Sequence, residues 1–144
     1  MIVRPYHPSD RQNLMDAINA VCAGGMMRTP RFEPTPAWEH ALAQPDCPCH
    51  LLLVDVEGAT VVGWCRLFPT DERALELGIG VVASHRRRGL GRALLGAALE
   101  WASARGMPVV LETRTDNTPA IRLFTRSGFR VVGQGDGHWQ MRYP

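Results

Sequence analysis

The 144-residue sequence predicts an α/β fold, with a central mixed β-sheet covered by helices on both faces. Three observations predict it: an early β-hairpin, a strand–helix–strand unit long enough for a parallel crossover, and a closing pair of strands. The hairpin covers residues 50–68, the crossover unit residues 75–113 and the closing pair residues 129–143. The predicted order of elements is β-α-α-β-β-β-α-β-α-β-β.

The first third of the chain holds a strand, two helices and a proline-rich loop. Residues 2–6 are a predicted strand, and Ser9 and Asp10 are predicted to cap a helix that ends at residues 24–25. Its apolar positions share one face: Leu14, Ala17, Ile18 and Val21. The proline-rich stretch that follows predicts a long loop with a short helix over residues 38–43.

The rest of the chain alternates between strands and helices. The helix over residues 89–105 is apolar on nearly every side, which predicts deep packing. Either Asn117 or Thr118 caps the last helix, which has Pro119 in its first turn. The predicted strands are 50–56, 60–68, 75–82, 109–113, 129–133 and 138–143, and the last helix is 117–127.

The charged residues exclude several functions. All 16 basic residues are arginine, so lysine Schiff-base chemistry, a P-loop lysine and lysine self-modification are excluded. A net charge of +2 argues against a general nucleic-acid or membrane binder. No apolar run approaches the roughly 18 residues of a membrane span, and the start lacks the apolar stretch of a signal peptide. A cytoplasmic protein is therefore expected.

The four cysteines do not have the spacing of a typical zinc site. Cys47 and Cys49 form a C-P-C motif followed by His50, whereas Cys22 and Cys65 are isolated. Because zinc usually requires two spaced pairs of ligands, we expect no metal and reduced thiols.

The segment over residues 81–93, VVASHRRRGLGRA, carries the most chemistry. A strand ends, three arginines follow, and Gly89 and Gly91 open an apolar helix. Glycines let a ligand approach N–H groups that have no partner at a helix start, where the helix dipole is positive. The segment therefore predicts a phosphate or pyrophosphate site, although a solvated basic loop remains an alternative. Its cations are Arg86, Arg87, Arg88 and Arg92.

A dinucleotide-binding loop is a further alternative. Its G-x-G-x-x-G pattern needs a third glycine where this chain has Leu94. Glu112 lies about twenty residues further on, as a ribose-binding acid would. Three arginines would crowd the turn, which argues against this alternative.

The loop and its surroundings resemble the GNAT superfamily of acyl-CoA-dependent N-acetyltransferases. Arg86-x-x-Gly89-x-Gly91 is similar to the family's R/Q-x-x-G-x-G/A signature. Residues 76–81, ELGIGV, resemble its preceding strand, and residues 117–129 resemble its N-x-x-A-x-x-x-Y-x-x-x-G-F pattern. With Arg4 in the opening I-x-R-P, the resemblance covers essentially the whole chain and implies a single N-acetyltransferase domain, residues 1–144, with a GNAT-like fold.

The resemblance implies acetyl-CoA in a gap between two splayed central strands. The pantetheine arm would pair with the backbone near residues 81–83, the pyrophosphate would take the loop N–H groups, and Asn117 would face the pantetheine or the thioester end. The implied cofactor-binding residues are Val81, Val82, Ala83, Arg86, Arg87, Arg88, Gly89, Leu90, Gly91, Arg92, Asn117 and Phe124.

Acid and base are less clearly indicated. Phe124 stands where many family members have a tyrosine that protonates the leaving thiolate. Water or another residue must therefore supply this proton. The alternative residues are Tyr143, Tyr6 and His138. A primary amine is only about one part in 2,500 neutral at pH 7, a handicap of roughly 4–5 kcal/mol, so a base is required. Glu76 is the first candidate, unless it is merely ion-paired. Glu112 and a solvent-exposed His85 are weaker ones.

The proline-rich loop and the hairpin are expected to form the acceptor wall. Its predicted lining residues are Phe32, Trp38, Trp64 and Arg66. Met26, Met27 and Trp38 would equally suit a lid over the core, and Arg31 or Arg66 would suit a carboxylate on the acceptor.

The expected activity is acetyl transfer to an amine by direct attack in a ternary complex, without an acyl-enzyme. The acceptor is a small amine or a peptide or protein N-terminus, and a homodimer is expected from the family's habit. A degenerate acyl-CoA sensor is the competing function.

Overall fold

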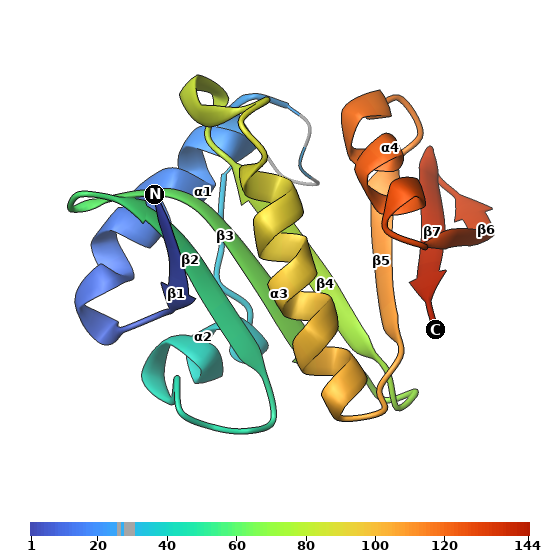
Figure 1. Ribbon diagram of the computed structural model, residues 1–144, viewed down its shortest axis with the longest axis horizontal. Helices are drawn as coiled ribbons and strands as arrows, with labels where there is room; N and C mark the ends of the chain where they lie inside the picture. Colours follow the sequence, from blue (N-terminus) through green and yellow to red (C-terminus); the bar gives the residue numbers. More distant parts are fainter. Residues whose placement is uncertain (26, 28–30) are drawn as a thin grey trace.

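The computed structural model describes residues 1–25, 27 and 31–144 and confirms the predicted fold class and order of elements. Within these described ranges, seven strands form one sheet in the order β1-β2-β3-β4-β5-β7-β6 (Figure 1), and only the β4–β5 pair is parallel. The strands are β1 (Ile2–Pro5), β2 (Leu51–Glu57), β3 (Thr60–Pro69), β4 (Leu75–Val81), β5 (Val109–Arg114), β6 (Arg130–Gly135) and β7 (His138–Tyr143). The helices are α1 (Arg11–Ala23), α2 (Pro36–Ala43), α3 (Leu90–Ala104) and α4 (Thr118–Arg126), with short 3-10 turns η1 (Pro8–Asp10) and η2 (Ala83–His85).

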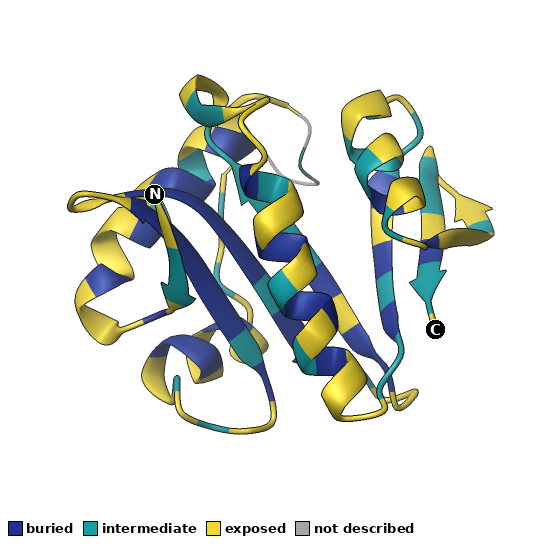
Figure 2. Ribbon diagram, viewed as in Figure 1, coloured by how far each residue is buried: buried dark blue, intermediate teal, exposed yellow. Residues whose placement is uncertain are grey.

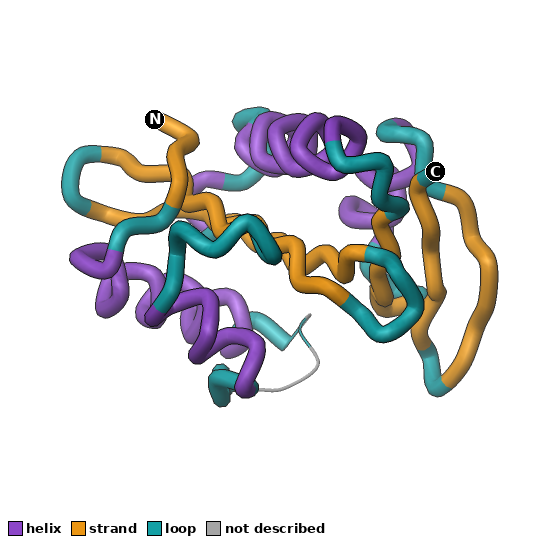
Figure 3. Tube along the Cα trace, turned by 90° about the horizontal axis from the view of Figure 1, so that it is seen from below, coloured by secondary structure: helices purple, strands orange, loops and turns teal. Residues whose placement is uncertain are grey.

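Helices lie on both sides of the sheet (Figure 3), and each side has its own apolar cluster. The first cluster joins α1 and α2 to β2 and β3, through residues such as Leu14, Trp38 and Val54. The second joins α3 and α4 to the centre of the sheet, through residues such as Leu94 and Leu111. None of the helices in the described ranges is long and apolar enough to cross a membrane.

The start of α1 differs from the predicted cap. Asp10 occupies the capping position, but its side chain makes no capping bond to α1. Its carboxylate instead accepts two hydrogen bonds from Arg4, at 2.7 and 2.8 Å, and one from the N–H of His7. The hydrogen bond from Arg4 lowers the pKa of the Asp10 carboxyl. The ring of His7, rather than Ser9, caps η1, because it accepts from the Ser9 N–H.

The prediction that α3 packs deeply on nearly every side was wrong. One face is buried, whereas Arg92, Ala93, Gly96 and Glu100 are exposed (Figure 2). Alanine and glycine count as apolar residues in the sequence, but they expose little apolar surface and therefore do not require burial on the outer face. The buried residues are Leu90, Leu94, Leu95, Ala98, Leu99 and Ala102.

Helix α2 begins earlier than predicted, at Pro36. The Thr35 side chain accepts from the N–H of Trp38, and a proline in the first turn is well tolerated because its missing N–H would have no partner there.

The expectation of reduced loop thiols was also wrong, since Cys47 and Cys49 form a disulfide. The short C-P-C turn brings their Cα atoms to 5.3 Å, within the usual range for a disulfide.

Candidate active site

The parallel strands β4 and β5 are paired only where they begin. Leu75 lies opposite Val109 and Glu76 opposite Val110, and no further pair joins the two strands among the described residues. Beyond this point β4 pairs with β3 and β5 pairs with β7. The strands diverge towards their carboxyl ends (Figure 1) and leave backbone groups on their facing edges for an extended ligand. This is the splayed arrangement that the resemblance implied.

The carbonyl of Val81 lies on the edge of β4 that faces this divergence. The N–H of Val82 donates to Val62 of β3 at 2.9 Å, so the groups of the preceding residue point the other way. Arg86 folds back, and its Nε donates to the Val81 carbonyl at 3.1 Å. A ligand that pairs with this edge must displace Arg86 or share the carbonyl, which can accept two hydrogen bonds.

The start of α3 presents backbone N–H groups beside several cations. Gly89 precedes the helix at φ +81°, and no side chain within the described ranges caps the helix there. A Cβ at Gly89 would have open space, so it is the left-handed backbone that favours glycine at this position. Arg86, Arg87 and Arg88 are exposed beside it, and Arg92 is exposed one turn further on. Positive charge and helix N–H groups therefore coincide at the wide end of the β4–β5 divergence.

Other residues of the predicted cofactor set differ in exposure. Val81 and Val82 are half-buried, Ala83 is exposed and Leu90 is buried. Gly91 lies against α4, because a Cβ there would be 3.4 Å from Leu123 Cδ2. The loop thus offers backbone and arginine side chains, while its leucine anchors the helix in the core.

Helix α4 begins on the opposite side of the divergence. Asn117 caps it, with its side-chain oxygen accepting from the N–H of Ala120 at 3.4 Å. Phe124 is only 5% exposed, and its ring centre is 5.6 Å from that of Phe129. Phe124 therefore packs in the core beneath α4, and it also occupies the position where the family pattern has a tyrosine.

In the described part of the chain, the ring that Phe124 meets is that of Phe129, and the three alternative proton donors are placed differently. Tyr143 packs on Phe129, with the two ring centres 5.5 Å apart. Tyr6 is buried in the cluster of α1 and α2, and His138 is hydrogen-bonded to the backbone of Asp136 in the β6–β7 turn. The placement of these three residues therefore does not single out one of them as a proton donor.

The face of β4 towards α1 and α2 is formed by three cross-strand pairs. Trp64 of β3 lies opposite Gly80, Arg66 opposite Gly78 and Phe68 opposite Glu76. A Cβ at Gly80 would be 2.3 Å from the Trp64 ring, and one at Gly78 would be 2.6 Å from Arg66 Nε. Two glycines thus let large β3 side chains lie across β4.

The Glu76 carboxylate is ion-paired with Arg66. Arg66 Nη1 lies 3.0 Å from Glu76 Oε1 and also donates to the Glu76 carbonyl at 3.1 Å. The Arg66 side chain is 17% exposed and that of Glu76 51% exposed, so solvent or a substrate reaches the carboxylate. The Arg66 guanidinium also lies over the Phe68 ring, with Cζ 4.6 Å from the ring centre.

An aromatic group continues this face towards the proline-rich loop. Phe32 and Trp38 meet edge to face at 5.0 Å, and Trp38 and Phe68 do so at 5.2 Å. Trp38, Phe68 and Trp64 are all buried, at 7%, 5% and 1% exposed, so they support the face, and Phe32 is the partly exposed ring of the group. Met27 packs against the same cluster, and Met26, the other predicted lid residue, lies outside the described part of the chain.

The weaker base candidates lie elsewhere. The prediction that His85 is solvent-exposed was wrong, because its side chain is 18% exposed and bonds both Glu57 and Ser84. The partner at Glu57 is 28 positions away in sequence, where no local pattern reveals it. Glu112, the other weaker base candidate, is exposed, and so is Arg31, which was predicted to suit a carboxylate on the acceptor.

Sequence reasoning missed the role of Phe68 and of the paired glycines. The signal was present, because Gly78 and Gly80 are two residues apart in a strand and therefore share a face. Two such glycines indicate that something bulky crosses that face.

Several known proteins are similar to this chain. The N-alpha-acetyltransferase RimI of Mycobacterium tuberculosis is 42% identical over 80 residues, which cover 53% of this chain and 49% of RimI. A mycothiol acetyltransferase of a Nocardioides species is 31% identical, over 95% of this chain and 45% of that protein. The chain thus spans about half the length of these curated relatives.

The fold is shared with solved structures. A Salmonella typhimurium protein solved with its cofactor acetyl-CoA superimposes with a TM-score of 0.80, covers 99% of this chain and 92% of its own, and is 23% identical. The model of the acetyltransferase (GNAT) family matches residues 21–129, which run from the end of α1 to the start of β6 and include the whole of the diverging β4–β5 unit. This chain belongs to the GNAT acetyltransferase family.

Proposed function

We propose that this chain acts as one domain that transfers an acetyl group from acetyl-CoA to an amine. The observation that carries the proposal is the divergence of β4 and β5 towards the arginine-rich start of α3. CoA has an extended pantetheine arm, which suits a free strand edge, and a pyrophosphate, which suits a helix N-terminus with arginines. The bound acetyl-CoA of the Salmonella protein with the same fold supports this choice.

The amine approaches from the face of β4 that carries Glu76. Its nitrogen attacks the thioester carbonyl carbon, a C–N bond forms, and the C–S bond breaks to release the CoA thiolate. The proton lost by the amine passes to the Glu76 carboxylate, directly or through water, and water protonates the thiolate. Arg66 positions the Glu76 carboxylate through the ion pair at 3.0 Å.

The environment of the cysteines favours direct attack over an acyl-enzyme. Burial raises the pKa of the Cys65 thiol to about 12, so this group is not a thiolate at neutral pH. Cys22 is buried, and Cys47 and Cys49 are joined in a disulfide. Incubation with acetyl-CoA alone should leave the intact mass unchanged, and a stoichiometric acetyl adduct on a cysteine would rule out this mechanism.

The acceptor face combines the Glu76 carboxylate, the Arg66 guanidinium and the partly exposed Phe32 ring, which is backed by the buried rings of Trp38 and Phe68. Such a face suits an amine whose remainder is flat or apolar, and Arg66 offers a partner for an acceptor carboxylate. The names of the two relatives concern an α-amino group and mycothiol, so both peptides and small amines belong in the acceptor panel.

The direct test is release of CoA with that panel of amines. The proposal expects at least one amine to be acetylated and one CoA released for each acetyl group transferred. If CoA binds tightly but no amine is acetylated, the chain is an acyl-CoA sensor, as Phe124 at the tyrosine position would allow. If NADH rather than CoA raises the melting temperature, the cofactor assignment is wrong.

A pair of glycine variants of α3 tests the pyrophosphate site. Gly91→Glu puts negative charge in the first helical turn and should weaken CoA binding by more than roughly 100-fold. Gly96→Glu adds the same charge to the exposed outer face, in open space, and should bind CoA normally. Calorimetry compares the two, and equal affinities would place the pyrophosphate elsewhere.

A further inference from the structure

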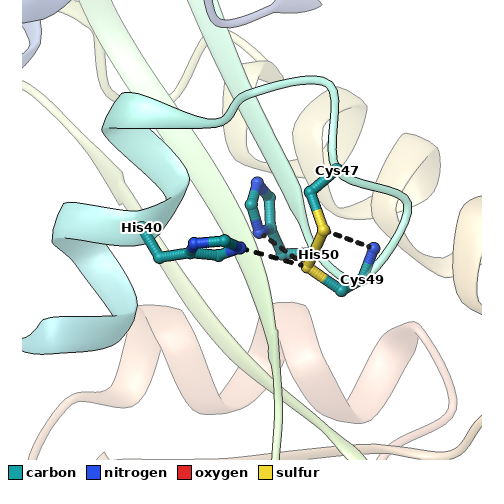
Figure 4. A group of neighbouring side chains, drawn as sticks. All are labelled: His40, Cys47, Cys49 and His50. Carbon is teal, nitrogen blue, oxygen red and sulfur yellow. Dashed lines mark hydrogen bonds between the residues drawn. A yellow bond between two sulfur atoms is a disulfide. The ribbon is translucent and has the colours of Figure 1, made fainter.

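Four metal-ligating side chains meet between α2 and β2, away from the β4–β5 divergence. His40 belongs to the last turn of α2, Cys47 and Cys49 lie in the connecting loop, and His50 immediately precedes β2. Figure 4 shows the two rings and the two sulfurs pointing towards one another. The acetyltransferase chemistry proposed above uses none of the four.

The donor atoms of this His40–Cys47–Cys49–His50 cluster lie close enough to share a single small ion once the bond between the two sulfurs is broken. One donor atom from each residue lies within 4.8 Å of the other three. Cys49 Sγ is 3.6 Å from His40 Nε2 and 3.3 Å from His50 Nδ1. A tetrahedral zinc ion with ordinary Zn–S and Zn–N bonds separates its donors by about 3.3–3.8 Å.

The donor set selects the metal. Two thiolates and two imidazoles in a tetrahedral arrangement favour zinc over hard cations such as Mg²⁺ or Ca²⁺, which prefer oxygen. The imidazoles are already oriented: the His40 and His50 rings meet edge to face at 5.3 Å, and His50 packs against Phe68 at 6.3 Å. The N–H of Cys49 donates to Cys47 Sγ at 3.3 Å, a contact that also stabilises a thiolate.

We propose that His40, Cys47, Cys49 and His50 bind one zinc ion when the Cys47–Cys49 disulfide is reduced. A small dithiol breaks the S–S bond and becomes a disulfide itself, leaving two cysteine thiols. Zinc binding then releases the two thiol protons. Disulfide and metal are thus alternative ways to fasten the same loop.

The proposed ion is structural because four protein ligands leave it no open position. It fastens the end of α2 to the start of β2, and α2 carries Trp38, which packs on Phe68 in the acceptor wall. Zinc should therefore raise the melting temperature of the reduced chain by about 5–10 °C at roughly 100-fold excess over Kd.

The test uses the full chain, reduced with a phosphine under nitrogen and freed of reductant. Zinc is measured by elemental analysis, and cobalt is added separately as a coloured substitute for zinc. We expect one metal per chain, cobalt–thiolate charge-transfer absorption, and the rise in melting temperature. The air-oxidised chain should show none of these.

Variants separate this cluster from adventitious binding. Cys47→Ser/Cys49→Ser should lose the cobalt–thiolate absorption, and His40→Ala, which removes an exposed ring, should weaken zinc binding at least tenfold without affecting folding. Cys22→Ala and His138→Ala leave the cluster intact and should bind zinc as the wild type does. The proposal is overturned if the reduced wild type binds no zinc, or if the double cysteine variant retains the cobalt spectrum.

Discussion

The two faces of β4 are formed by alternate residues of one strand, yet they differ in almost every property. Leu75 and Leu77, on the face towards α3, are buried in an aliphatic cluster. On the other face stand Glu76, Gly78 and Gly80, crossed by large side chains from β3. The comparison shows how one strand serves stability and chemistry together. On the closed face the large side chains belong to β4 itself, whereas on the other, open face they belong to β3 and lie across the two glycines of β4.

Leu77→Ala should be the most damaging change, and it acts on the closed face. Removing a buried leucine side chain leaves a cavity, so we expect the free energy of unfolding to fall by about 2–5 kcal/mol. Denaturant unfolding measures the loss. Folded protein should retain its affinity for CoA, and a loss below about 1 kcal/mol would mean that the aliphatic face does not carry the stability assigned to it.

Gly80→Ala should be the next most damaging, through overpacking rather than a cavity. The new Cβ would lie 2.3 Å from the ring of Trp64, which is buried and cannot swing aside. We expect a loss of about 1–3 kcal/mol. Adding Trp64→Phe removes the clashing ring atoms, so the double variant should be more stable than the sum of the single changes predicts. Simple additivity would contradict the close contact.

The aliphatic face could be predicted from the sequence, and so could the position of the glycine- and arginine-rich loop at the start of α3. Leu75, Leu77 and Val81 alternate with other residues, and the two glycines after the arginines mark a helix start. These signals are local, as are those of the hairpin and the crossover.

The open face could not be predicted in the same way. That Arg66 lies opposite Gly78 depends on the register of β3 and β4, and its pairing with Glu76 depends on a side-chain direction. His85 is covered by Glu57, and His40 meets Cys49 across a helix and a loop. Such contacts arise from the fold as a whole, so they cannot be inferred from residue spacing alone.

Gly78→Ala should separate the two functions of the strand. Its Cβ would lie 2.6 Å from Arg66 Nε, but this flexible, partly exposed side chain is able to move. Stability should stay within about 1 kcal/mol of the wild type, because the clash is offset by alanine's lower conformational entropy cost. Loss of the Arg66–Glu76 geometry should lower kcat while the affinity for CoA stays unchanged. A stability loss as large as that of Gly80→Ala would show that Arg66 is as rigid as Trp64.

Glu76→Gln should have the smallest effect on stability and a large one on turnover. The ion pair with Arg66 involves a half-exposed carboxylate, so its loss should cost less than about 1 kcal/mol. If Glu76 accepts the amine proton, acetyl transfer should fall by roughly 100- to 10,000-fold near neutral pH. It should recover in part as the pH rises and more of the amine is neutral, whereas CoA affinity should not change.

Glu112→Gln is the matched control, since it removes an exposed carboxylate from the neighbouring strand β5. If Glu112→Gln lowers turnover and Glu76→Gln does not, the base lies on β5, and the open face of β4 only positions the acceptor.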